Sequence, residues 1–188
     1  MANKTTIALS RDQYKEIIET IQQGFSGMLP NDRVATALML EANLGLRIGD
    51  VLQLRLCDII RDGDRYRLDI REEKTGKKRR FTVPVILQQF IENYCYRNGI
   101  GRKERIFPIT VRNVQMILQK TCDWLGYEGI STHSFRKFYA TEIYKNNDYN
   151  IVLVQHLLQH RHASTTQRYI GIEPKEVEEA ILGHLQLL

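Results

Sequence analysis

The spacing of hydrophobic positions divides the chain into helical segments on either side of a short alternating one. Before residue 57 the spacing favours helices over residues 11–23, 32–43 and 48–56. Ser10 and Gln13 are spaced as a capping box at the start of the first helix, and Gly24 follows its end. The first third of the chain is therefore predicted to be helical.

Apolar and polar residues alternate between residues 58 and 83, which is typical of half-buried strands. Two turn signals, Asp62-Gly63-Asp64 and Thr75-Gly76, divide this stretch. The pattern predicts a three-stranded antiparallel meander with strands at 58–61, 65–71 and 79–83.

After Pro84 the pattern is helical again. Predicted helices cover residues 85–97, 110–125, 133–145, 150–159, 164–170 and 174–187. The fold class is therefore mainly α with one small antiparallel sheet (α+β). With 188 residues and neither a repeat nor a Pro- or Ser-rich linker, the chain is expected to form one domain over residues 1–188.

Composition excludes several classes of protein. The chain is 43% hydrophobic and 26% charged, which is an ordinary globular composition, and no apolar run approaches the roughly 18 residues of a membrane helix. The N-terminus lacks the apolar block of a signal peptide. Three cysteines, an odd number with no CxxC pair, fit reduced thiols. A cytoplasmic protein with no membrane partner is expected.

The excess positive charge is concentrated in one segment. The chain has 27 Lys and Arg against 22 Asp and Glu, a net charge of +5, and residues 71–80 (REEKTGKKRR) contribute six basic and two acidic residues, or +4. Such a patch favours a polyanionic partner, nucleic acid first, although a solvated turn would look the same. Lys77, Lys78, Arg79 and Arg80 are the candidates for contacts with a nucleic-acid backbone.

Three other segments carry candidate chemistry. Arg47 follows a Gly-containing turn between two apolar helices and can project into a cleft. His133 and Arg136 are three residues apart at a helix start, so they share one face, joining a proton acceptor to a bidentate phosphate binder. Tyr169 lies on a very short helix opened by a Ser-x-x-Gln capping box, and it is expected to be movable.

A metal site is the alternative explanation for the histidines near residue 160. His156 and His160 are four residues apart and His162 is close, as in some metal sites. Leu157, however, occupies the glutamate position of the HExxH zinc motif, and the cluster contains no cysteine or carboxylate. No metal and no cofactor are expected.

Taken together, these segments resemble the tyrosine recombinases, or phage-type integrases, over nearly the whole chain. The resemblance rests on the LGLR turn, the Lys-Thr-Gly hairpin, the HxxR box, and a histidine nine residues before a tyrosine. It implies the family's catalytic-domain fold. The catalytic residues that it implies are Arg47, Lys74, His133, Arg136, His160 and the nucleophile Tyr169.

The chain departs from the family pattern at several points. Gln159 replaces the family's glycine before His160, and the neighbouring His156 and His162 leave open which histidine donates a hydrogen bond to the phosphate. Asp50 stands where the family has a supporting carboxylate. The family's separate helical DNA-clamping domain is not expected within these residues, so the chain resembles either an isolated catalytic domain or short members such as the fimbrial phase-switch invertases.

The resemblance implies a site-specific DNA recombinase or integrase that cleaves and rejoins strands through a covalent 3′-phosphotyrosyl intermediate, without metal or ATP. It implies double-stranded DNA as substrate, a homotetramer on DNA, accessory DNA-bending proteins, and a mobile element acting on a bacterial nucleoid. The alternatives are a topoisomerase of type IB, which relaxes supercoils without a partner duplex, and a DNA-binding module without chemistry.

The last predicted helix has an apolar stripe that includes Val177, Ile181 and Leu185. Either the helix packs on its own domain or, as in the family, residues 173–188 dock on a neighbouring protomer and help to build the tetramer. Deleting residues 174–188 would separate the two, since only the second interpretation expects assembly on DNA to be lost.

Overall fold

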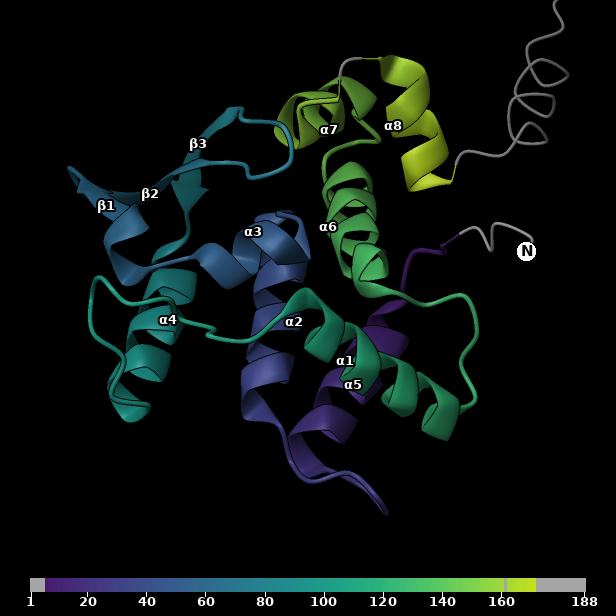
Figure 1. Ribbon diagram of the computed structural model, residues 1–188. Helices are drawn as coiled ribbons and strands as arrows, with labels where there is room; N and C mark the ends of the chain where they lie inside the picture. Colours follow the sequence, from purple (N-terminus) through teal and green to yellow (C-terminus); the bar gives the residue numbers. More distant parts are fainter. Residues whose placement is uncertain (1–5, 161, 172–188) are drawn as a thin grey trace, which may run out of the picture.

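The protein is described by a computed structural model over residues 6–160 and 162–171 (Figure 1). The described part is mostly helical with one small antiparallel sheet, which confirms the predicted fold class. The helices are α1 (Arg11–Gln23), α2 (Asp32–Leu44), α3 (Ile48–Gln53), α4 (Val85–Arg97), α5 (Val111–Leu125), α6 (Thr132–Asn146), α7 (Ile151–Leu158) and α8 (Ala163–Ile170). The strands are β1 (Ile59–Asp62), β2 (Arg65–Arg71) and β3 (Lys78–Val83), in the order β1-β2-β3.

Most helix ends follow the capping signals in the sequence, but α8 begins at Ala163 after His162, which makes no side-chain cap bond, so the predicted capping box of Ser164 and Gln167 does not open this helix. The capping box of α1 is present: the Gln13 amide donates to Ser10 Oγ at 3.1 Å, and the Ser10 amide donates to Gln13 Oε1 at 3.0 Å. Gly45 ends α2 at φ +60°, and a β-carbon there would lie 2.4 Å from the Tyr139 ring. The turn that precedes Arg47 therefore requires glycine.

The third helix is shorter than predicted because tertiary pairing interrupts it. α3 ends at Gln53 rather than residue 56, since the Leu54 carbonyl accepts a hydrogen bond from the Ile106 amide at 2.9 Å and Arg55 pairs with Arg105. A 3-10 turn, Leu56–Asp58, then leads into β1. The predicted helix over 174–187 lies outside the described residues.

The main core surrounds α2, which contacts α1, α3 and α6. Its side chains Val34, Leu38 and Leu40 are fully buried. In Figure 1 the sheet lies beside α3 and above α4, while α6 leads up to α7 and α8. This arrangement brings the start of α3, the β2–β3 turn and the start of α6 together at one side of the core.

A second, smaller apolar cluster holds α8. It consists of Ala140, Val154, Leu158 and Tyr169, so it joins α6, α7 and α8. The helix that carries Tyr169 therefore rests on a few side chains rather than on the main core. Within the described ranges, no helix has the length and apolar character needed to cross a membrane.

Candidate active site

Arg47 stands at the start of α3, where its guanidinium faces the hairpin. Arg47 Nη1 lies 2.7 Å from Glu72 Oε2, and the same carboxylate oxygen accepts from Thr75 Oγ1 at 2.6 Å. Glu72 is buried, whereas the Arg47 side chain keeps 30% of its surface exposed. Glu72 thus fixes one edge of a guanidinium whose other donors can reach a ligand.

Arg136 is buried beneath the site, with 1% of its surface exposed. Its Nη1 donates to the Gly45 carbonyl at 2.7 Å and its Nη2 to the Leu158 carbonyl at 3.3 Å. Gly45 is two residues before Arg47, and Leu158 is two residues before His160. One arginine from α6 therefore ties together the two segments that carry other predicted site residues.

Lys74 is exposed in the turn between β2 and β3, on the rim of a pocket of about 300 Å³. Asp50 lines the same pocket, and its Oδ1 accepts a hydrogen bond from the Glu73 amide at 2.9 Å, which holds the turn against α3. The pocket is lined by Glu41, Arg47, Ile48, Gly49, Asp50, Glu73, Lys74, Thr132 and His133. The structure therefore brings Arg47, Lys74 and His133 around one opening.

Tyr169 is held between two histidines. Its ring lies 5.1 Å from that of His133 and 5.1 Å from that of His160, edge-on in both pairs, and Lys137 Nζ lies 5.6 Å from its ring centre. The residue is 9% exposed, and its Oη faces the Arg136 guanidinium without forming a well-aligned hydrogen bond to a described side chain. Burial raises the pKa of Tyr169, and the nearby charge of Arg136 offsets this only in part.

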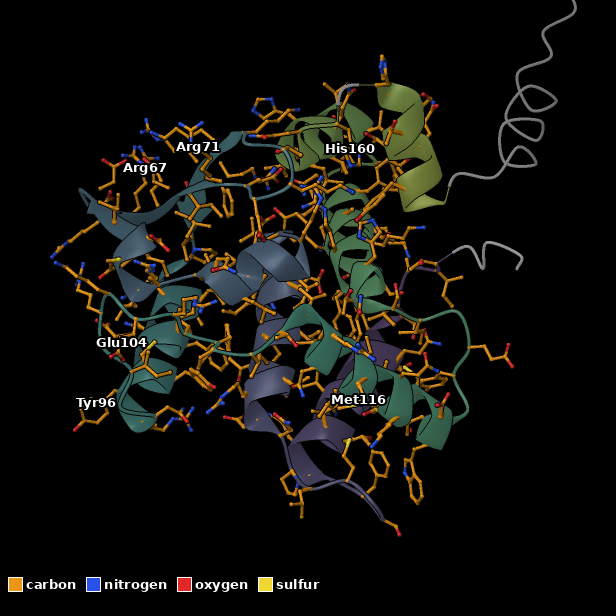
Figure 2. The ribbon with its side chains drawn as sticks, in the orientation of Figure 1. Arg67, Arg71, Tyr96, Glu104, Met116 and His160 are labelled. Atoms are coloured by element: carbon orange, nitrogen blue, oxygen red, sulfur yellow. The ribbon has the colours of Figure 1, made fainter. Side chains whose placement is uncertain are left out.

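His160 lies where the chain passes from α7 to α8, as Figure 2 shows. Its Nδ1 is 3.1 Å from Thr166 Oγ1, so the ring is held by the helix that carries Tyr169. His156 and His162 are exposed. Among the described histidines, His133 and His160 are the pair whose rings contact Tyr169.

Both site histidines are harder to protonate than usual. His133 is exposed at the pocket rim, yet desolvation of its ring and the charges of Arg136, Lys137 and Arg47 lower its pKa to about 4. Desolvation and the same two arginines also lower the pKa of His160 to about 4. Both imidazoles are therefore neutral near pH 7 and can accept a proton.

These shifts make stability depend on pH. Between pH 6.5 and about 4 the unfolded chain protonates its histidines before the folded protein does, so the histidines lower the free energy of unfolding as the pH falls. A His133→Asn/His160→Asn variant is expected to lose less stability than the original chain across this window. Urea unfolding of both proteins at pH 7.5, 6 and 5 measures the difference, and parallel curves would contradict the lowered pKa values.

The basic segment is divided between two faces of β3. Lys78 and Arg80 are exposed and both pair with Asp69, at 3.4 and 2.8 Å, and Lys77 is exposed beside them. Arg79 departs from the expected DNA contact: it is 3% exposed, and its Nη1 donates to the Leu157 carbonyl at 2.6 Å. The cause is the pleat of the strand, which turns alternate side chains inward.

Two carboxylates of the site were not singled out from the sequence. Glu72 looked like one charge among many in the basic segment, but it is buried between Arg47 and Arg79. Glu41 lies on α2 with 1% exposure, and burial raises its pKa well above the usual value despite the charge of Arg136. An acid within the apolar stretch of residues 34–42 was the available signal for Glu41. Across residues 6–160 and 162–171, no three His, Cys, Asp or Glu side chains are grouped as metal ligands.

Comparison with known proteins identifies the family. The sequence matches the profile described as the phage integrase family over residues 8–176. It is 33% identical over 138 residues to the probable integrase/recombinase YoeC of Bacillus subtilis, covering 70% of this chain and 73% of that protein. The chain belongs to the phage integrase family. It also resembles tyrosine recombinase XerA of Pyrococcus furiosus, with 27% identity over 93% of this chain and 60% of XerA, so it spans less than two thirds of that relative.

Solved structures show that the integrase fold extends over the described chain. The catalytic domain of bacteriophage HP1 integrase superposes with a TM-score of 0.66 and 16% identity, covering 95% of each chain. XerH recombinase in a post-cleavage complex with its difH substrate gives a TM-score of 0.69 with 18% identity, covering 95% of this chain and 53% of XerH. The predicted membership of the tyrosine recombinases is confirmed.

Proposed function

We propose that this chain cleaves and rejoins DNA strands at a specific site, with Tyr169 as the nucleophile. The observation that carries the proposal is the position of Tyr169 between the rings of His133 and His160, with the charge of the buried Arg136 nearby. The similarity to XerH bound to its difH substrate, and to a lambda integrase dimer bound to a core site, supports DNA as the partner.

Arg47 and Arg136 are proposed to stabilise the transition state. Negative charge grows on the non-bridging oxygens as the phosphate becomes five-coordinate, and two fixed guanidiniums neutralise it without reorganisation. Arg136 is anchored by backbone carbonyls and Arg47 by Glu72, so each is positioned before the phosphate arrives. His160 would donate a further hydrogen bond through Nε2, because Nδ1 is engaged by Thr166.

The proton transfers follow from the states of the side chains. Tyr169 is protonated in the free protein, since burial raises its pKa, and the neutral His133 accepts the phenolic proton as Oη attacks phosphorus. The bond between phosphorus and O5′ breaks, and Lys74 Nζ gives its proton to the departing oxygen. The Tyr169–phosphate bond remains available for attack by a 5′-hydroxyl, so rejoining needs no ATP. Each proposed step is performed by a side chain of this protein, and no step uses a metal or cofactor.

The partners follow from the same proposal. The substrate is double-stranded DNA, and recombination would assemble several protomers on it as a homotetramer. Accessory DNA-bending proteins are candidate further partners. The segment 173–188, proposed to be exchanged between protomers, lies outside the described residues. The site of action would be the bacterial nucleoid.

Covalent trapping tests the proposed function. Nicked duplexes from the DNA that flanks the gene would be incubated with the protein and separated on a denaturing gel. We expect a shifted protein–DNA band that forms in the presence of EDTA and leaves a free 5′-hydroxyl, detected by labelling with polynucleotide kinase. Binding without a band on any flanking duplex would contradict the proposal, and relaxation of supercoiled plasmids without a specific site would favour the topoisomerase alternative.

Exposed and buried cations of β3 should differ in their effect on DNA binding. Lys78→Ala and Arg80→Ala are each expected to reduce the slope of log K against log salt by about 0.9, because each removes one phosphate contact. Arg79→Ala should leave the slope unchanged and lower the free energy of unfolding by about 1–3 kcal/mol, because Glu72 and the Leu157 carbonyl lose a buried partner. Titrations at several salt concentrations, with urea unfolding, separate the two effects; a flatter slope for Arg79→Ala would overturn the distinction.

A further inference from the structure

Gln159, the residue that ends α7, adopts a conformation usually reserved for glycine. Its φ is +54°, in the left-handed region, and it directly precedes His160. A side chain at such a position is strained, and strain of this kind persists where surrounding contacts hold it. The contacts of Gln159 therefore indicate what this side chain contributes.

The Gln159 side chain reaches the hairpin. Its Nε2 donates to the Lys78 carbonyl at 3.1 Å, and the main-chain carbonyl of Gln159 accepts from Lys77 Nζ at 3.2 Å. A third hydrogen bond joins β3 to α7, from Arg79 Nη1 to the Leu157 carbonyl at 2.6 Å. Figure 1 shows the turn between β2 and β3 reaching the end of α7, where these bonds form. Glycine at position 159 would relieve the strain but would lose the side-chain bond.

The bonds from Gln159 fix the turn that carries Lys74. On the β2 side, the turn is held by the Glu73 amide donating to Asp50 Oδ1 at 2.9 Å. Across the turn, the Glu72 amide donates to the Lys77 carbonyl at 2.9 Å. The contacts of Gln159 hold the β3 side, so the turn is attached to α3 at one end and to α7 at the other.

We propose that Gln159 is a positioning residue for Lys74. Gln159 fixes the β2–β3 turn on α7, so that Lys74 and His160 contact the same phosphate. The inference rests on the proposed function, because it takes Lys74 as the acid that protonates O5′. Gln159 itself contacts neither the phosphate nor the leaving group. Its contribution is the orientation of the lysine, which a glycine could not supply.

The proposed role of Lys74 can be tested with a substrate whose leaving group needs no proton. When sulfur replaces the bridging O5′, the Tyr169 Oη–phosphorus bond forms and the phosphorus–sulfur bond breaks with the electron pair left on sulfur. A thiolate is stable near neutral pH, so this departure needs no proton from Lys74. A defect that acts through Lys74 should therefore disappear on the 5′-thio substrate.

Two variants of Gln159 separate positioning from stability. Gln159→Gly removes both the hydrogen bond and the backbone strain, whereas Gln159→Met keeps the length and the strain but lacks the donor. Asp148→Gly is the matched control, because Asp148 also has a positive φ, +51°, and lies in the loop before α7. Single-turnover formation of the covalent product would be measured on oxygen and 5′-thio duplexes, together with the melting temperature.

Both Gln159 variants are expected to slow cleavage of the oxygen substrate by about 10- to 100-fold and to cleave the 5′-thio substrate at close to the original rate. Gln159→Gly should melt at or above the original temperature, so instability would not explain its loss. Asp148→Gly should cleave both duplexes normally. If Gln159→Gly cleaved both substrates as fast as the original chain does, or lost rate equally on both, the inference would be overturned. Failure of the original chain to form a covalent product on either duplex would instead overturn the proposed function.

Discussion

Tyr169→Phe is expected to abolish the covalent protein–DNA product while leaving the fold and DNA binding intact. The phenylalanine ring keeps the edge-on contacts with His133 and His160. Tyr169 Oη is buried with only a weakly aligned contact to Arg136, so its removal should change the free energy of unfolding little. Denaturing gels measure the product, gel-shift titrations measure binding, and urea unfolding measures stability.

Tyr144→Phe is the matched control. Tyr144 packs on the same small cluster as Tyr169 and contacts the Tyr149 ring, but it has no contact with either site histidine in the described structure. This variant should form the covalent product at the original rate. A covalent product that persists in Tyr169→Phe would place the nucleophile elsewhere, and loss of DNA binding by that variant would show that the substitution disturbs more than the reaction.

Short-range signals made most of the fold predictable. The capping box of α1, the glycine after α2 and the two turns of the meander each depend on residues within a few positions of one another. The predicted end of α3 was wrong because the Leu54 carbonyl accepts a hydrogen bond from the amide of Ile106, a partner 52 residues away that no local pattern reveals. Local chemistry thus fixes most helix ends, and long-range pairing changes the others.

The candidate site also contains residues that short motifs predict and residues whose role depends on long-range packing. Arg47, His133, Arg136 and Tyr169 belong to short motifs, and the resemblance to the family selected them before their contacts were known. The residues that hold them depend on packing: Glu72 is an ordinary acid in the sequence and becomes the anchor of Arg47 only when β2 lies beside α3. For Gln159 the sequence revealed the departure from the family glycine, but only the structure reveals the contact with the hairpin that gives this departure a role.

Arg136→Lys is expected to lower the single-turnover rate of cleavage by about 10²- to 10³-fold. The guanidinium reaches the Gly45 and Leu158 carbonyls from two nitrogens and still has donors for a phosphate, whereas an ammonium group cannot span the same positions. The free energy of unfolding should also fall, by about 1–3 kcal/mol, since a buried carbonyl loses its donor. Quenched-flow trapping at saturating protein and urea unfolding measure the two effects.

Two further lysine variants distinguish the catalytic effect of Arg136 from its effect on stability. Arg47 is more exposed and has one ion-pair partner within 3 Å, Glu72, so Arg47→Lys should slow cleavage to a similar extent with little loss of stability. Arg11→Lys, in the exposed pair with Glu142, should change neither quantity. If Arg136→Lys cleaved within about threefold of the original rate, its guanidinium would act only as a structural link between α2 and α7. A loss of rate shared by Arg136→Lys and Arg47→Lys, with a loss of stability in Arg136→Lys alone, would show that both arginines bind the reacting phosphate.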